Sequence, residues 1–322
     1  MQIKIKNIKN LLVISKKIRS KVQNLFALFL HKVYSLFLFN SKLNPKIIHI
    51  CFSFDRALQL DNYIRTFKAN YEHDLDIDFF VIYKYSSEVH FSCYERLISK
   101  FNEIKFIKES NFKKDINKIL NNYRSNHILF FGVDDIEFIR PFSLRDIHSQ
   151  INTLVSLKKE KIVFSLRHGL NLNKSIQCRL DKMDLPLNLK FKDKYLSWKF
   201  RFGKGEWGYP LAVDCHFFLL RDLKTFIKFA YFYSPNSLEA SLQTLKKEFN
   251  CSIGISYKKS ICFNNPNNKV QNEYDNYSLN SNKDFLAKKY LEGFFIKQKK
   301  DILKIQNSTH IAFDYELTKG DE

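Results

Sequence analysis

The chain has 322 residues, of which 45% are hydrophobic and 16% are aromatic. A chain of this length and composition can bury a substantial core, which excludes wholesale disorder. Its 53 Lys and Arg residues outnumber its 33 Asp and Glu residues, for a formal net charge of +20. Such a charge implies anionic partners, such as phosphates or acidic lipid head groups.

Residues 1–44 form a basic arm, since no acidic residue precedes Asp55. Within the arm, residues 24–39 are an apolar run that His31 and Lys32 interrupt, and a spanning helix needs about 20 apolar residues. No small-residue cleavage site follows, which argues against a secretory signal. We expect an amphipathic helix that binds an anionic membrane surface. The alternative is a helix that packs on the following domain.

Beyond the arm, apolar strands alternate with helices. Buried strands are predicted at residues 47–54, 77–83, 104–107 and 127–133. Helical spacing of apolar residues predicts helices near residues 60–67, 91–101 and 112–123. This order implies right-handed crossovers between parallel strands. Because ligands of such sheets bind beyond the carboxyl ends of the strands, we expect the functional site at that edge.

The second half of the chain is less regular. Ser143 is expected to cap a helix, and the polar stretch 171–194 is predicted to be a loop over the site. Further strands are predicted at residues 162–166, 196–202, 211–220 and 310–315, helices near 223–230, 238–245 and 285–300, and an Asn-rich loop at 264–280. No Pro/Gly/Ser-rich linker divides the chain, so residues 45–322 are predicted to form one catalytic domain.

An acidic pair, Asp134 and Asp135, directly follows the fourth predicted strand. Two neighbouring carboxylates repel each other unless a cation or another positive group offsets their charge. Mg²⁺ or Mn²⁺, held by carboxylates and by substrate phosphates, is one such cation. The alternative is that the pair caps the next turn or helix.

Three segments resemble GT-A-fold, family-2-like nucleotide-sugar glycosyltransferases. They are FGVDDIEFI around the acidic pair, IIHICFSFDRALQLDNYI at the first strand, and WGYPLAVDCHFFLLRDL further on. The resemblance covers roughly residues 47–263. It differs from the family pattern in having no spaced Asp-x-Asp at residues 133–135, and in having Cys215 where glycine is usual.

The resemblance implies a GT-A (Rossmann-like) mixed sheet flanked by helices. It also implies transfer of a sugar from a nucleotide-sugar donor to a cell-surface glycan or a lipid-linked acceptor. Asp134 and Asp135 would hold Mn²⁺ or Mg²⁺, which offsets charge on the departing nucleoside diphosphate. Asp214 would be the general base for the acceptor hydroxyl; the alternative is a buried carboxylate that Tyr209 or backbone groups satisfy. His216 would lie beside the site or pack in the core.

The donor is expected to contact a set of residues at the strand ends. These residues are Ser53, Asp55, Arg56, Lys84, Asp134 and Arg167. Arg56 can give two parallel hydrogen bonds to a phosphate, although Asp55 and Arg56 could instead simply start a helix. Trp198 and Trp207 are candidates for a wall on which a sugar stacks, or for core packing.

Two other functions remain open. A metal-dependent nucleotidyl- or phosphotransferase would favour a glycine-rich phosphate loop after the first strand, and residues 54–57 contain no glycine. A non-enzymatic basic protein that binds membrane or nucleic acid would lack an organised acidic cleft. We expect no nucleic-acid partner, because the basic residues of the arm are interleaved with Ile, Leu and Phe.

The six cysteines form no CxxC pair, which excludes zinc-finger spacing. Several lie in apolar runs, as reduced and buried thiols would. A reducing compartment fits this pattern. Together with the basic arm, it predicts a cytoplasmic protein that is peripheral to the inner face of the membrane.

Overall fold

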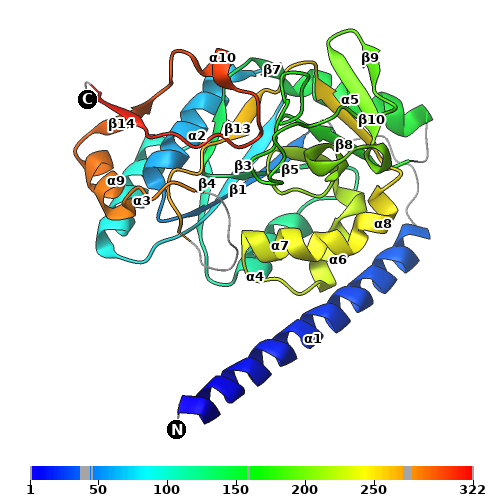
Figure 1. Ribbon diagram of the computed structural model, residues 1–322, viewed down its shortest axis with the longest axis horizontal. Coiled ribbons are helices and arrows are strands. Elements are labelled where there is room, and N and C mark those ends of the chain that lie inside the picture. The colour runs from blue at the N-terminus through cyan, green and yellow to red at the C-terminus, as the bar shows by residue number, and fades with distance from the viewer. Residues whose placement is uncertain (1, 37–43, 45, 158–159, 271–277, 321–322) are drawn as a thin grey trace.

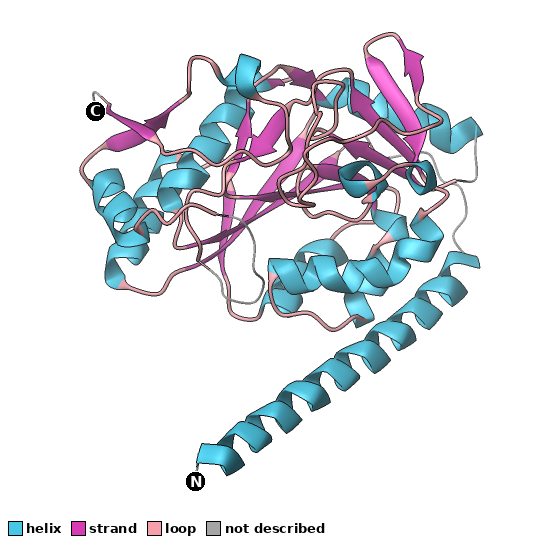
Figure 2. Ribbon diagram, viewed as in Figure 1, coloured by secondary structure: helices cyan, strands magenta, loops and turns pink. Residues whose placement is uncertain are grey.

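The computed structural model describes residues 2–36, 44, 46–157, 160–270 and 278–320. A large twisted sheet lies at the centre of the molecule with helices on both faces, and one long N-terminal helix extends away from this body (Figures 1 and 2). The two apolar layers on the faces of the sheet hold the fold together.

The central sheet has nine strands within the described residues, in the order β4-β3-β1-β5-β11-β8-β12-β10-β9. Its strands are β1 (Ile47–Phe54), β3 (Ile77–Lys84), β4 (Lys105–Lys108), β5 (Ile128–Val133), β8 (Ile162–Ser165), β9 (Lys190–Lys192), β10 (Tyr195–Lys199), β11 (His216–Leu219) and β12 (Ile253–Tyr257). Strands β4, β3, β1 and β5 are parallel, whereas β11 is antiparallel to both β5 and β8. The predicted mixed sheet flanked by helices is confirmed.

Strand β1 shows why the sequence forms a two-sided core. Successive side chains of a strand point to opposite faces. Ile47 and Cys51 accordingly pack in one apolar layer, and Ile48, Ile50 and Phe52 pack in the other. A strand that is buried on both faces is mostly apolar, which explains the composition of β1, where only His49 and Ser53 are polar.

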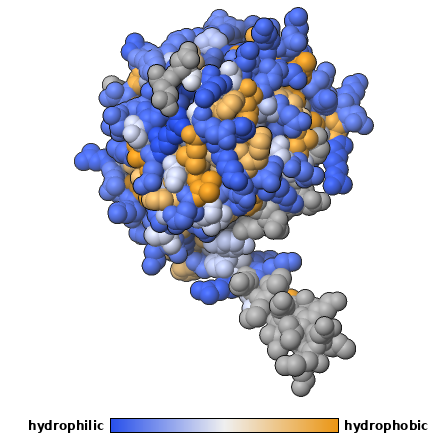
Figure 3. All heavy atoms as spheres, turned by 90° about the vertical axis from the view of Figure 1, so that its left-hand side faces the viewer, coloured by the Kyte–Doolittle hydropathy of each residue, from blue (hydrophilic) through white to orange (hydrophobic). Residues whose placement is uncertain are grey.

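Helices supply the rest of each layer. The first layer contains side chains of α2 (Ala57–Asn70), α3 (Glu88–Lys100), α5 (Leu144–Leu157) and α9 (Lys283–Leu291). The second contains side chains of α4 (Phe112–Asn121), α6 (Lys224–Phe229) and α7 (Pro235–Leu242). The predicted cap is present on α5, where the Asp146 N–H donates to Ser143 Oγ over 3.0 Å. The face that carries α9 and β14 is mostly hydrophilic (Figure 3).

Shorter elements complete the chain. They are β2 (Tyr71–Glu72), β6 (Ile136–Phe138), β7 (Phe142–Ser143), β13 (Cys262–Asn264), β14 (Phe294–Lys297), β15 (Glu316–Lys319), α8 (Lys246–Phe249) and α10 (Ile302–Ile305). Strand β6 pairs with β13, and β14 pairs with β15.

Two predictions for the C-terminal part were wrong. The predicted helix 285–300 ends at Leu291, because its second half forms β14. The predicted strand 310–315 is irregular apart from one isolated bridge between Asn264 and His310. Both segments form their backbone hydrogen bonds with partners that are distant in the sequence, and local apolar spacing does not report such partners.

The N-terminal arm contains α1 (Gln2–Leu36), whose second half packs on the domain. Asn24 joins it to α7 and to the chain after α6: its Nδ2 donates to Ser241 Oγ over 3.2 Å, and its Oδ1 accepts from the Tyr231 N–H over 2.7 Å. Ala27 and His31 are buried on the same face. Among the helices of the described chain, none combines the length and apolar character that crossing a bilayer requires. Residues 37–39 of the predicted membrane helix lie outside the described residues.

Candidate functional site

The predicted acidic pair lies at the carboxyl end of β5, directly beside the end of β1. The Asp134 N–H donates to the Phe52 carbonyl over 3.2 Å, and the Phe54 N–H donates to Asp134 Oδ2 over 3.3 Å. Parallel pairing of β1 with β5 brings these ends together, although 80 residues separate them. The sheet thus forms the polar edge that the order of elements predicted.

Arg56 lies between the two carboxylates of the acidic pair. Its Nη1 is 3.1 Å from Asp134 Oδ1 and 3.2 Å from Asp135 Oδ2. Its Nη2 donates to the main-chain oxygen of Asn268. The Arg56 side chain is only 11% exposed, so its charge offsets the carboxylates in a poorly hydrated environment. In the described structure the positive group that the acidic pair requires is therefore Arg56.

Asp134 nevertheless remains an electrostatically costly residue. Burial raises the pKa of its carboxyl to about 6; the charge of Arg56 acts in the opposite direction, and Asp135 adds to the increase. Ser53 lies next to it at the end of β1 and shares a 2.7 Å hydrogen bond with the Tyr94 hydroxyl. A carboxyl with such a pKa gains from any further positive charge that reaches it.

The Asn-rich segment 264–268 forms hydrogen bonds with Asp135 of the acidic pair. Asn264 Nδ2 donates to Asp135 Oδ1 over 2.9 Å, and the Asn265 N–H donates to the Asp135 main-chain oxygen over 2.8 Å. Asn265 Nδ2 also donates to Glu137 over 3.1 Å, a buried carboxyl whose pKa burial raises to about 7. The sequence predicts only a loop at this segment. Its four buried asparagines in five residues were the available signal, because buried amides require polar partners.

The residues of this edge fit a hard divalent cation. Carboxylate and amide oxygens are the ligands that Mg²⁺ and Mn²⁺ prefer, and Asn264 Oδ1 is a buried oxygen without a hydrogen-bond partner. The described residues contain no group of three His, Cys, Asp or Glu side chains arranged to hold a metal. Substrate phosphates would have to supply further ligands, and a cation here would compete with Arg56.

A second charged pair, Arg167 and Asp214, lies where β8 ends and β11 begins. Arg167 Nη1 is 3.1 Å from Asp214 Oδ2. Burial raises the pKa of Asp214 to about 7, against the charge of Arg167 and together with the negative charges of Glu239 and Asp135. A carboxyl that exchanges its proton near neutral pH can act as a general base. The predicted base thus has a suitable pKa, and its 17% exposed side chain retains access to solvent.

The sequence alone does not indicate three further residues of this second cluster, which are Glu206, His310 and Glu239. Glu206 is 3.9 Å from both Arg167 and His310, and its Oε1 accepts hydrogen bonds from Ser175 Oγ and Thr309 Oγ1. Burial alone would raise the pKa of Glu206, but the charge of Arg167 lowers it to about 2.

Glu239 is the third missed residue. It accepts from the Tyr209 hydroxyl and from the Val213 N–H, each over 2.9 Å. Single acidic residues in irregular segments gave no pattern that could have indicated the role of Glu206 or Glu239.

Cys215, which directly follows the predicted base, has a left-handed backbone with φ of 50°. Glycine adopts this conformation without strain, whereas residues with a Cβ rarely do. The family pattern has glycine at this position, and the structure gives the physical reason. Its N–H donates to the Phe131 carbonyl over 2.8 Å, which fixes the neighbouring Asp214 against β5.

Two predicted donor contacts are separated from the acidic pair. The Asp55 carboxylate is buried and fully engaged: it accepts from the N–H and the hydroxyl of Ser86 and pairs with Lys283 Nζ over 2.6 Å. Its backbone is also left-handed, with φ of 53°. Lys84 is 57% exposed and lies 3.8 Å from Glu109, with Phe54 beneath its ammonium group. Asp55 therefore acts within the described structure as a link between β1, the loop after β3, and α9.

The two tryptophans and His216 are core residues. Trp207 and Trp198 are 0% and 1% exposed, and Trp198 Nε1 donates to the Trp207 carbonyl over 3.0 Å. His216 is 1% exposed, and its Nδ1 lies 3.3 Å from the Pro210 carbonyl. A sugar cannot stack on rings that are enclosed in this way, so of the two interpretations core packing is the correct one.

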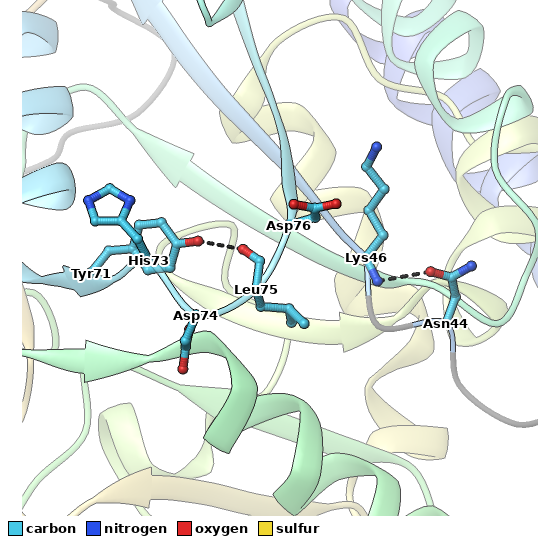
Figure 4. A pocket seen from close by; sticks show the side chains of 7 residues that line it. All are labelled: Asn44, Lys46, Tyr71, His73, Asp74, Leu75 and Asp76. Carbon is cyan, nitrogen blue, oxygen red and sulfur yellow. Dashed lines mark hydrogen bonds between the residues drawn. The ribbon is translucent and has the colours of Figure 1, made fainter.

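An open cavity of about 650 Å³ lies at the other end of β1 and β3, lined by Asn44, Lys46, Tyr71, His73, Asp74, Leu75 and Asp76 (Figure 4). The residues lie before the first residues of these strands, Ile47 and Ile77. The acidic pair lies beyond the carboxyl end of the sheet, so this cavity does not belong to the candidate site.

Comparison with known proteins identifies one relative. The chain is 27% identical over 234 residues to the bifunctional glycosyltransferase pgtA of Dictyostelium discoideum. The chain is related to a glycosyltransferase. This match confirms the glycosyltransferase resemblance that the sequence predicted. It covers 67% of this chain but 27% of pgtA, so the chain spans only about a quarter of the length of that relative.

The other comparisons add little. No family model matches the chain. A crystal structure of S. aureus TarS aligns with a TM-score of 0.40 and 12% sequence identity, over 74% of this chain and 38% of that chain. A similarity at this level carries no argument about fold or function.

Proposed function

We propose that the chain transfers a sugar from a nucleotide-sugar donor to a glycan or lipid-linked acceptor with the assistance of Mn²⁺ or Mg²⁺. The observation that carries the proposal is the pair of charged clusters at one edge of the sheet. One is an acidic pair with a raised pKa at Asp134, and the other is a carboxyl with a pKa of about 7 at Asp214. The relationship to a glycosyltransferase supports the same conclusion.

Each cluster has a distinct task in this proposal. Asp134 and Asp135 would hold the cation, which would supply positive charge to offset that of the departing diphosphate. Arg56 moves its two hydrogen bonds from the carboxylates to a phosphate oxygen, for which a guanidinium is well suited. Asp214 accepts the proton of the acceptor hydroxyl as that hydroxyl attacks the anomeric carbon. Arg167 holds the Asp214 carboxylate in place over 3.1 Å.

The proposal is tested by thermal-shift measurements with UDP, GDP and dTDP, each with and without Mn²⁺. A ligand that binds only the folded state raises the unfolding midpoint by mass action. We expect a Mn²⁺-dependent increase with one of the diphosphates and its loss in Asp135→Asn. Absence of any shift with the whole panel would contradict a donor site at this edge.

We propose further that α1 binds the protein to an anionic membrane at the cytoplasmic face. Apolar side chains follow one exposed stripe of the helix, at spacings of three and four residues: Ile14, Ile18, Val22, Leu25, Phe29, Val33 and Leu36. Lys17, Arg19, Lys21 and Lys32 are exposed alongside it. Each basic residue near an anionic leaflet contributes about 1 kcal/mol. Two copies of such a stripe would bring like charges together, which favours a lipid surface over self-association.

Phe29→Glu tests this second proposal, because the Phe29 side chain is 61% exposed on the stripe. A Phe side chain that becomes buried in lipid contributes roughly 1.5–3 kcal/mol to membrane binding, and Glu does not provide this contribution. We expect at least tenfold weaker co-sedimentation with vesicles of phosphatidylserine and phosphatidylcholine. The matched control is Phe191→Glu on β9, since Phe191 is similarly exposed at 59%. Equal binding of both variants would show that the stripe does not contact lipid.

A further inference from the structure

The C-terminal segment that crosses the candidate site carries a histidine between the two charged clusters. The Asn264 N–H donates to the Thr309 carbonyl over 2.8 Å, and the Ile311 N–H donates to the Asn264 carbonyl over 2.9 Å. These bonds hold His310 directly beside Asn264, whose side chain donates to Asp135. On its other side, His310 contacts Arg167 and Glu206 of the second cluster.

The tautomer of His310 follows from its contact with Arg167. Arg167 Nη2 lies 3.3 Å from His310 Nδ1. A guanidinium has only donors, so Nδ1 must accept this hydrogen bond. The Thr309 hydroxyl, 3.1 Å from Nδ1, directs its own hydrogen to Glu206 over 2.8 Å. In the neutral ring the remaining proton is therefore on Nε2.

The hydrogen bonds of the His310 ring within the described chain both involve Nδ1, so its Nε2–H group has no acceptor there. The side chain as a whole is 16% exposed. Burial, and then the charge of Arg167, lower the pKa of His310 to about 4. The ring is consequently neutral at physiological pH, and Nε2–H is its one donor that remains available to a ligand.

The charges around His310 indicate what this donor binds. Both nearby guanidinium groups are already paired, Arg56 with the acidic pair and Arg167 with Asp214. Arg167 contacts both Asp214 and His310, and Asn264 pairs with His310 and donates to Asp135, so the three side chains lie around one part of the site. The negative charge of Asp135 acts on both Asp214 and His310. A neutral N–H at this point suits an uncharged oxygen better than a phosphate.

We propose that the Nε2–H of His310 donates to a sugar hydroxyl bound between Asp135 and Asp214, and so selects the sugar that reacts there. The inference rests on the proposed glycosyltransferase function and adds a residue for recognition of the sugar. The hydroxyl belongs either to the donor sugar or to the acceptor sugar, which share this chemistry.

The test compares wild type, His310→Ala and His310→Gln, together with His73→Ala as a control at the opposite end of the sheet. Gln retains a side-chain N–H donor, whereas Ala does not. Calorimetry with Mn²⁺ measures the Kd of UDP-, GDP- and dTDP-sugars and of the matching diphosphates. Transfer from the sugar nucleotide that binds wild type to a panel of methyl glycosides gives KM for the acceptor.

Loss of one hydrogen bond to an uncharged group corresponds to about a tenfold weaker interaction. If His310 contacts the donor sugar, His310→Ala increases the Kd of the nucleotide sugar about tenfold and leaves the Kd of the diphosphate unchanged. If His310 contacts the acceptor sugar instead, the Kd values of the nucleotide sugar and the diphosphate stay the same, and KM for the glycoside rises about tenfold. In either case His310→Gln recovers most of the loss, and His73→Ala matches wild type.

Other results overturn the inference. Unchanged Kd and KM values in His310→Ala would show that Nε2 binds no sugar. Equally weaker binding of the diphosphate and the nucleotide sugar would show that His310 has a structural role. An equal loss in His310→Gln would exclude the donor role. If wild type itself binds no member of the panel, the proposed function fails, and this inference fails with it.

Discussion

Replacement of Arg56 by Met would remove the positive group that lies between Asp134 and Asp135. The side chains of the three residues are only 11%, 5% and 13% exposed, so water cannot replace the guanidinium efficiently. Breaking a buried ion pair by removal of one partner costs about 3–5 kcal/mol. We expect Arg56→Met to lower the free energy of unfolding by an amount in this range at pH 8.

The loss should depend on pH because Asp134 can take up a proton. Its pKa of about 6 in the folded protein lies above the ordinary value of 3.8, a difference of about two units or roughly 3 kcal/mol. The folded state thus binds this proton more tightly than the unfolded state, and stability falls as pH rises from about 4 to about 6. Without Arg56 the carboxyl pKa rises further, so the variant should lose less stability at pH 5 than at pH 8.

Urea unfolding at both pH values measures this effect. Arg56→Lys retains a positive charge and should lose less stability than Arg56→Met. Lys105→Met is the exposed control: Lys105 is 57% exposed and pairs with Asp78 over 2.9 Å, and such surface pairs contribute about 0–1 kcal/mol. A loss in Arg56→Met no larger than in this control, or one that is identical at pH 5 and pH 8, would refute the electrostatic reasoning.

Three other predictions concern the same edge of the sheet. Asp135→Asn should abolish Mn²⁺ binding, measured by calorimetry, while circular dichroism remains that of wild type; retained binding would exclude Asp135 as a ligand. Transfer by wild type should increase with pH through about 7, as Asp214 loses its proton, and Asp214→Asn should reduce kcat by about 10²–10⁴-fold at every pH. An unchanged pH profile in that variant would assign the base elsewhere. Gly132→Ala should destabilise the fold by about 1–3 kcal/mol in urea, because the added Cβ would lie 2.1 Å from Tyr63 Oη; wild-type stability would contradict this packing.

Much of the fold could be predicted because its information is local. The apolar run 47–54 is β1, and the predicted strand 127–133 differs from β5 by one residue. Strands that are buried on both faces and helices with one apolar stripe leave regular patterns in the sequence. The position of Asp134 and Asp135 at a strand end follows from the same pattern. The sequence by itself therefore determined the first half of the sheet and the edge at which charged residues gather.

Only the tertiary structure decided which groups surround those charges. Arg56 reaches the acidic pair because β1 and β5 are parallel neighbours, and Asn264 reaches Asp135 across 129 residues of chain. Arg167 and His310 meet across 143 residues. Burial and Coulomb interactions act through space, and the pKa values of Asp134, Asp214 and His310 follow from neighbours that no local spacing specifies. The sequence indicates which residues can carry charge, and folding decides which of those charges are paired, buried or left facing the site.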